Sequence, residues 1–219
     1  MIATIGNVKE TPGRVTVETV RPDTQNLSDT VTVLWQDARQ ITPEQRRKVY
    51  ALLGELAVWS GNTKDEAKAG MKANFRLQAV DGIHRKAFSL SDCDLSTARE
   101  FISFIVDYMI ENDVPTARPL IEYADDAERY VYSCLMHKKC AVCGKKCDLH
   151  HVDHVTDRGF RNNINHLGLR CLPLCRLHHN EAHNTPEKEF LDKYHLTPVA
   201  IDERIAKMYR LGGKDKDHE

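Results

Sequence analysis

The sequence predicts an α+β protein, in which a small N-terminal antiparallel sheet with helices leads through a long connecting helix to a C-terminal metal-binding domain. Three observations predict this fold. Residues 14–20 alternate polar and apolar side chains as a strand does, and apolar residues recur at helical spacing between residues 43 and 112. The third observation is the concentration of cysteine and histidine within residues 140–183.

The first elements are strands and helices with recognisable ends. The strand at residues 14–20 is rich in β-branched side chains and follows a Pro12-Gly13 turn signal. A further strand is predicted at residues 30–35, which would give a small antiparallel sheet. These segments carry no chemical motif, and we expect them to be structural.

Three helices are predicted next, two of them from capping boxes. Thr42 is followed three residues later by Gln45, and Thr63 by Glu66, and an apolar stripe follows each pair. A third helix is predicted at about residues 94–112, with one apolar face. These stripes are typical of core-facing helices.

The expected domain organisation follows from these elements. An N-terminal domain covers residues 1–117, one long helix at residues 118–139 connects it to the metal-binding domain at residues 140–211, and residues 212–219 form a disordered tail. Two short helices are predicted after Thr-Pro pairs, at Thr185-Pro186 and Thr197-Pro198.

Composition limits the class of protein. Hydrophobic residues make up 41% and charged residues 29% of the chain, values ordinary for a soluble globular protein. The sequence has no signal sequence and no apolar run long enough for a membrane span, which predicts a cytoplasmic protein. Seven cysteines, an odd number, favour a reducing compartment and metal binding over a disulfide framework.

Four residues have the spacing of a structural zinc site. The Cys140-x-x-Cys143 pair and the Cys175-x-x-His178 pair supply three thiolates and one imidazole, which suit tetrahedral zinc. Cys147 could replace Cys143, although the turn formed by Cys140-x-x-Cys143-Gly is tighter. We call Cys140, Cys143, Cys175 and His178 the zinc knuckle.

A second set of histidines remains once the zinc knuckle is assigned. His150 and His151 are adjacent, and His179 and His183 are four residues apart. If Cys175 opens a helix that runs to about residue 184, His179 and His183 lie on one face of it and His178 points roughly 100° away. One helix could therefore serve two metals.

This layout resembles the HNH, or ββα-metal, nuclease family. The segment is also similar to phage proteins that read Leu-His-His, Pro-Leu-Cys-Arg, His-His and Glu-Ala-His. The resemblance implies that His150, His179 and His183 bind a catalytic divalent metal and that His151 is the general base.

The resemblance leaves two assignments open. An Asn that braces the intervening loop would be Asn163 or Asn165, and spacing does not choose between them. A shifted register, with Asp153 as ligand and His154 as base, is the alternative.

The chemistry suits hydrolysis of a phosphodiester bond. A neutral histidine deprotonates water near neutral pH, and a cation stabilises the charge that develops on the phosphate. The metal could be Mg²⁺, Mn²⁺, Ni²⁺ or Zn²⁺, and a first shell made only of imidazoles favours the transition ions. The formal net charge of −1 means that contacts with DNA must come from local patches. Arg158 and Arg161 are candidates for phosphate contact, or they are solvated loop residues.

The N-terminal part resembles the phage lambda Orf (NinB) recombination mediator family in residues 41–58 and in the order of elements up to about residue 135. This resemblance implies a homodimer that binds single-stranded DNA, associates with single-strand-binding protein and helps to load a phage recombinase. Arg46, Arg47 and Lys48 would then contact DNA, although charges on a helix are more often its solvated face.

The sequence therefore favours a metal-dependent HNH DNA endonuclease that acts in phage recombination or replication in the bacterial cytoplasm, on single-stranded or branched DNA. The alternative is a non-catalytic zinc-knuckle mediator that binds single-stranded DNA and single-strand-binding protein. A homing endonuclease is less favoured, because no dedicated recognition helix is evident beyond the zinc knuckle.

Overall fold

The structure is a computed structural model that describes residues 4–11, 14–20, 39–78, 87–153 and 166–211. The chain divides into two compact units, residues 1–36 and 37–219, and each is described by itself. Within these ranges the protein has the mixed helical and antiparallel-strand architecture that the sequence predicts, so the α+β fold class is confirmed.

The first unit contains a two-stranded antiparallel sheet. Strand β1 (Thr4–Thr11) pairs with β2 (Arg14–Val20), and the register places Thr11 opposite Arg14. The strand predicted at residues 14–20 is confirmed. Its partner in the structure is the preceding segment, β1, and the strand predicted at residues 30–35 lies outside the described residues.

Helices α1 (Pro43–Ser60) and α2 (Lys64–Leu77) begin where the sequence predicts. The Thr42 side chain accepts a hydrogen bond from the backbone N–H of Gln45, and the Gln45 side chain accepts one from the backbone N–H of Thr42, both at 3.1 Å. The same reciprocal pair joins Thr63 to Glu66. Two orphan N–H groups are thereby satisfied at each helix start, so both capping boxes are confirmed.

Helix α3 (Leu95–Glu111) lies at the centre of the helical core and packs against α1, α2 and a later helix. The Phe75 ring of α2 meets the Phe101 ring of α3 edge-on, with their centroids 5.2 Å apart. The core-facing stripe of α3 is fully or almost fully buried and includes Ala98, Phe101, Ile102, Ile105 and Met109. The helix predicted at about residues 94–112 is confirmed.

The connection at residues 118–139 is shorter than one continuous helix. A 3₁₀ turn (Leu120–Glu122) comes first, and helix α4 (Ala127–Met136) begins only after Asp126, whose carboxylate accepts a hydrogen bond from the N–H of Arg129. The neighbouring Asp125 accepts hydrogen bonds from Gln45 and Lys48 of α1. The predicted long helix is therefore wrong in extent, because two acidic side chains stabilise a break and a new N-cap inside the apolar stripe.

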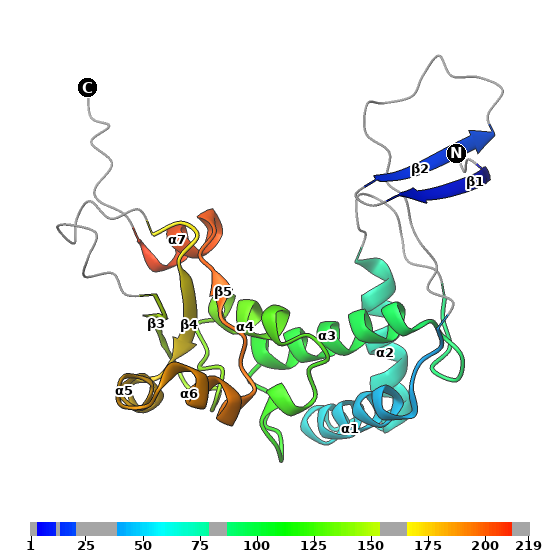
Figure 1. Cartoon of the computed structure of the whole chain (residues 1–219). Coiled ribbons are helices and arrows are strands. Elements are labelled where there is room, and N and C mark those ends of the chain that lie inside the picture. Colours follow the sequence, from blue (N-terminus) through cyan, green and yellow to red (C-terminus); the bar gives the residue numbers. More distant parts are fainter. Residues whose placement is uncertain (1–3, 12–13, 21–38, 79–86, 154–165, 212–219) are drawn as a thin grey trace, which may run out of the picture. The chain divides into compact units, whose positions relative to one another are not determined.

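The C-terminal part of the second unit is a small antiparallel sheet with helices. Strands β3 (Asp148–His151), β4 (Arg170–Leu174) and β5 (Val199–Ala200) pair in the order β3-β4-β5. Helix α5 (Arg176–Asn184) follows β4 directly, as Figure 1 shows. Strands β3 and β4 with α5 give the ββα arrangement that the sequence predicts.

Two short helices complete the fold. Helix α6 (Glu187–Tyr194) follows Pro186 as predicted, whereas Thr197-Pro198 leads into strand β5. Helix α7 (Glu203–Tyr209) begins later, where the Asp202 carboxylate accepts a hydrogen bond from the N–H of Ile205. The prediction of a helix at Thr197-Pro198 is wrong, because the edge of the sheet takes up this segment and an Asp supplies the cap.

One buried cluster joins the helical core to the metal-binding segment, since it runs from Ile41 to Ile205. A buried tyrosine of α4 and a half-buried tyrosine of α7 strengthen this connection. The Tyr130 hydroxyl donates to the carbonyl of Ala141 at 2.9 Å, and the Tyr209 hydroxyl donates to the carbonyl of Leu135 at 3.0 Å. The ligand-bearing segment is therefore held against α4 by core packing and by hydrogen bonds.

None of the described helices is both long and apolar enough to cross a lipid bilayer.

Candidate metal centre and active site

The zinc knuckle assembles as the sequence predicts. Sγ of Cys143 lies 3.7 Å from Sγ of Cys175, and Nδ1 of His178 lies 3.2 Å from Sγ of Cys175 and 3.5 Å from Sγ of Cys140. A tetrahedral zinc with Zn–S bonds of about 2.3 Å and Zn–N bonds of about 2.0–2.1 Å sets sulfur donors about 3.8 Å apart and sulfur and nitrogen about 3.5 Å apart. The four donors therefore fit a zinc ion.

Backbone geometry around Cys140 positions the first two thiols. The N–H of Gly144 donates to the carbonyl of Cys140 at 2.8 Å, and the N–H of Cys140 donates to the carbonyl of Lys145 at 2.6 Å. Gly144 has a φ of 69°, the left-handed conformation that glycine adopts at little cost. The tight turn brings Cys143 back over Cys140, whereas Sγ of Cys147 lies 3.6 Å from the hydroxyl of Tyr209 and outside the four-donor cluster.

Cys175 occupies the N-cap of α5, where backbone N–H groups favour a thiolate. Burial alone would raise the pKa of Cys175, but hydrogen bonds from the His178 and Leu177 backbone and contacts with the other two thiols lower it. Burial raises the pKa of the Cys143 thiol to about 12. The α5 N-cap thus favours the thiolate of Cys175, whereas burial favours the neutral thiol of Cys143.

The second cluster consists of His150, His179 and His183, whose ring nitrogens all lie within 4.8 Å of one another. The ring centroid of His150 is 4.6 Å from that of His179 and 4.9 Å from that of His183. Nδ1 of His150 is buried and has no hydrogen-bond partner. A buried nitrogen without a partner is costly unless something binds it, so this atom fits a metal ligand.

Burial, together with the neighbouring His179 and His183, lowers the pKa of His150 to about 4. Burial also lowers the pKa of His179. Both imidazoles are therefore neutral at pH 7, the form in which histidine binds a metal. We call His150, His179 and His183 the three-histidine cluster.

Helix α5 divides its histidines between the two clusters, as its periodicity predicts. Cys175 and His178 face the thiols, and His179 and His183 lie one turn apart beside His150 of strand β3. Successive helical residues are about 100° apart, so His178 and His179 serve different clusters. One helix therefore carries residues of two separate clusters that could each hold a metal ion.

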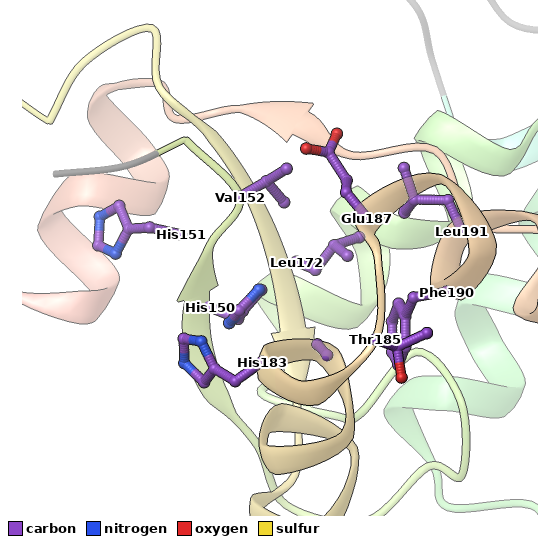
Figure 2. Close-up of a pocket in the computed structure, with 10 residues that line it drawn as sticks. His150, His151, Val152, Leu172, His183, Thr185, Glu187, Phe190 and Leu191 are labelled. Atoms are coloured by element: carbon purple, nitrogen blue, oxygen red, sulfur yellow. The ribbon is translucent and has the colours of Figure 1, made fainter.

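His151 lies next to the three-histidine cluster but points to the other side of strand β3, away from His150 and His183 (Figure 2). Its Nε2 shares a hydrogen bond of 3.0 Å with Nδ1 of His166. Burial and the adjacent His166 lower the pKa of His151, and Asp153 opposes this shift. His151 is therefore neutral near pH 7, with its ring held in place from one side.

Asp153 is held by Arg170 and lies outside the three-histidine cluster. Its carboxylate accepts hydrogen bonds from Nε and Nη2 of Arg170 at 2.9 and 2.8 Å and from the Arg170 backbone N–H at 2.7 Å. Nη1 of Arg170 donates to Glu187 at 2.8 Å. This geometry favours the His150/His151 register over Asp153/His154, although His154 lies outside the described residues.

A pocket of about 230 Å³ lies beside the two histidines of β3. His150, His151 and His183 contribute its polar wall, and Glu187 lies at its far side (Figure 2). Thr185 and five apolar side chains complete the lining: Val152, Leu172, Ala182, Phe190 and Leu191. The pocket is thus bordered by two candidate metal ligands, and His151 borders it while its ring points to the other side of β3.

The remaining candidates divide between described and undescribed residues. Asn163, Asn165, Arg158 and Arg161 lie outside the described residues. On α1, Lys48 is engaged by Asp125 at 2.7 Å and by Glu44 at 3.7 Å. Arg47 is exposed, and Arg46 donates a hydrogen bond to the carbonyl of Ser91.

Two residues of the site escaped the sequence analysis. His166 reads as a polar loop residue, and Arg170 as one charged position at the start of a strand. Their contacts with His151 and Asp153 depend on the pairing of β3 with β4, which a single sequence does not specify. The sequence offered one signal for these contacts: His166 and Arg170 lie close to an apolar run that could form a strand and pair with residues 148–151.

Comparison with known families agrees with this geometry. The family model described as "Putative HNHc nuclease" matches residues 15–212. The chain belongs to this family. No curated protein matches the chain, and no solved structure matches it. The match spans both the helical core and the metal-binding segment, and it supports a nuclease activity, a hydrolase chemistry and DNA as substrate.

Proposed function

We propose that this family member is a metal-dependent DNA endonuclease whose active site is the three-histidine cluster with His151. The observation that carries the proposal is His150, whose ring lies against two further imidazoles at the edge of a pocket and whose buried Nδ1 has no hydrogen-bond partner. A structural site alone would give these histidines no role, because the zinc knuckle already has four donors.

In this proposal His150, His179 and His183 hold a divalent cation, which when bound supplies charge stabilisation at the scissile phosphate. His151 accepts the proton of the attacking water through the ring nitrogen that His166 does not contact. His166 keeps the ring of His151 in one orientation and one tautomer, as the partner of a catalytic histidine does elsewhere. The resemblance to HNH nucleases would give Asn163 or Asn165, which lie outside the described residues, the role of bracing the intervening loop.

The zinc knuckle has a separate role. It ties the segment after α4 to the start of α5, so that β3 and α5 present their histidines to one another. The two pairs of ligands begin at Cys140 and Cys175, which are 35 residues apart in the sequence. Zinc bound by both pairs therefore stabilises the folded form of the whole segment between them. Zinc in the knuckle is therefore structural.

The three-histidine cluster should prefer Zn²⁺, Ni²⁺ or Mn²⁺ to Mg²⁺, because imidazole ligands favour transition ions. We further propose that the substrate is single-stranded or branched DNA met in phage recombination or replication, in the cytoplasm of the bacterial host. Single-strand-binding protein, a recombinase and a second copy of the chain are the partners that the resemblance to recombination mediators suggests. Arg158 and Arg161 would contact phosphate beside the active site.

The test is cleavage of end-labelled single-stranded, duplex and branched DNA by the zinc-loaded chain, with Mg²⁺, Mn²⁺, Ni²⁺ or extra Zn²⁺ added separately. Cleavage should require an added metal and should fall about 10²–10⁴-fold in His151→Ala, the usual contribution of a general base. His137→Ala, outside both clusters, is the matched control and should cleave as the parent does. DNA binding without cleavage under every metal would instead support the non-catalytic mediator.

A further inference from the structure

A second pocket, of about 340 Å³, lies between α1, α2 and the segment before α3. Its volume falls within the roughly 300–1,000 Å³ of typical small-ligand sites. The residues that line it are Arg46, Tyr50, Lys68, Lys72, Ser89, Leu90 and Ser91. Three of these described residues are cationic and none is acidic, in a chain whose formal net charge is −1. We call this the cationic pocket.

Arg46 provides the most direct sign that an anion belongs there. Its Nη2 donates to the carbonyl of Ser91 at 2.6 Å, whereas its Nε is buried and has no hydrogen-bond partner. A buried N–H of a charged group is costly to leave unsatisfied. Arginine presents its N–H groups in a fork that matches the oxygens of a phosphate, and because Arg46 lines the pocket, a phosphate bound there would meet this guanidinium.

The two lysines of α2 lie where an incoming anion can bind them. Lys68 contacts the carboxylate of Asp65 at 2.7 Å, and the Asp65 side chain is 89% exposed. A surface ion pair of this kind contributes little, so a phosphate can replace the carboxylate. The ammonium of Lys72 donates to the carbonyl of Phe88 and lies 4.6 Å from the centre of the Phe88 ring.

An exposed aromatic ring lies beside these cations. Tyr50 of α1 is 42% exposed, and Nζ of Lys68 lies 5.8 Å from the centre of its ring. An exposed ring next to cationic side chains is the combination that binds single strands, since bases stack on the ring and phosphates meet the cations. A duplex keeps its bases stacked on one another and cannot use the ring in this way.

We propose that the cationic pocket binds a single-stranded nucleic acid, with Arg46, Lys68 and Lys72 on the phosphates and Tyr50 against a base. This proposal rests on the proposed function in one respect: it assumes that the anion bound in the cationic pocket is the phosphate of a nucleic acid. It assigns to α1 and α2 a strand-binding role separate from cleavage. Asp92, which accepts a hydrogen bond from Ser91 Oγ at 3.2 Å, adds a negative charge next to the pocket and weakens binding.

The experiment measures the affinity of a fluorescent oligothymidine by anisotropy over a range of salt concentrations. It uses the full-length zinc-loaded His151→Ala chain without added divalent metal, so that cleavage does not intervene. Lys68→Gln with Lys72→Gln should weaken binding about tenfold or more. A plot of log affinity against log salt concentration has a negative slope. Loss of two phosphate contacts should make this slope about 1.4 less steep, since each contact on a single strand contributes about 0.7.

The matched control replaces two exposed cations outside the pocket, Arg99→Gln with Lys207→Gln, and should bind near the parental affinity. Lys68→Arg with Lys72→Arg keeps the charge and should bind as the parent does. Tyr50→Leu should weaken binding to the single strand and leave duplex binding unchanged, and Asp92→Asn should strengthen binding.

Equal affinity and equal salt dependence for the Lys68→Gln, Lys72→Gln pair and the control pair would overturn the proposal. So would the absence of binding to any single strand by the parent chain. Because these readouts involve no cleavage, a chain that binds through the pocket but never cuts would contradict the proposed nuclease and leave the cationic pocket supported.

Discussion

The zinc knuckle and the three-histidine cluster share helix α5 but differ in chemistry and in number of donors. The knuckle joins three thiols to one imidazole, with donor distances of 3.2–3.7 Å that already fit a metal. The three-histidine cluster has imidazoles only and three donors instead of four, and its His183 is exposed beside a pocket. A closed four-donor set suits structure, whereas an open three-donor set leaves a metal accessible to substrate.

The largest effect that distinguishes the two clusters should follow Cys175→Ala. This change removes a thiolate at the N-cap of α5, so the chain should lose its tightly bound zinc and with it the folded metal-binding segment. Metal analysis should show the loss of one zinc per chain, and thermal unfolding should begin far below that of the parent.

His179→Ala is the matched change on the same helix and should keep the knuckle zinc and the parental unfolding midpoint. If Cys175→Ala retained both zinc and stability, the assignment of the knuckle as the structural site would be wrong.

A smaller effect is expected at His166, which contacts His151 but not the cluster. His166→Phe removes the hydrogen bond to Nε2 of His151 and should lower kcat about 10–100-fold, the usual effect of a partner that orients a functional histidine. KM should remain unchanged, because the substrate does not contact this residue in the proposed mechanism. Steady-state cleavage kinetics give both values.

His166→Gln, which can still bond the ring of His151, should recover part of the lost kcat. A purely structural role would instead lower stability in both variants and would give no such recovery.

A graded effect of pH is expected at His150. Burial lowers its pKa to about 4, below the roughly 6.5 of an unfolded histidine, so between these values the unfolded chain binds the extra proton. Stability from neutral His150 is thus fully present above about pH 6.5 and is lost as the pH falls toward 4. Urea unfolding at several pH values, with the three-histidine cluster free of metal, measures this loss.

His150→Gln should show a shallower fall in unfolding free energy over the same range, since it removes the titrating group while the zinc knuckle is unchanged. An identical pH dependence in parent and variant would show that His150 is not neutralised by burial.

Much of this organisation follows from local sequence rules. Capping boxes at Thr42 and Thr63 specify helix starts through bonds three residues apart, and the four-residue spacing of His179 and His183 specifies a shared helix face. These interactions lie within one helical turn, so a single sequence contains them in full. Each half of the knuckle, Cys140 with Cys143 and Cys175 with His178, is equally local in sequence, whereas the meeting of the two halves is a contact between distant segments.

The remainder depends on contacts between distant segments. The break before α4 is stabilised by Asp125 bonding to Gln45 and Lys48, about eighty residues away in sequence, as separations of 80 and 77 show. The bonds of His151 to His166 and of Asp153 to Arg170 likewise depend on strand register. The cationic pocket also requires α1, α2 and residues 89–91 to meet, which no local pattern predicts.

The central claim is that one helix carries two metal sites with separate roles, and His183→Ala tests it most directly. Cleavage of labelled DNA by the zinc-loaded parent and variant would be measured with and without added Mn²⁺ or Ni²⁺, together with zinc content and thermal unfolding. The account predicts that His183→Ala retains its zinc and unfolds as the parent does but no longer cleaves DNA. Cleavage at the parental rate by His183→Ala would contradict it.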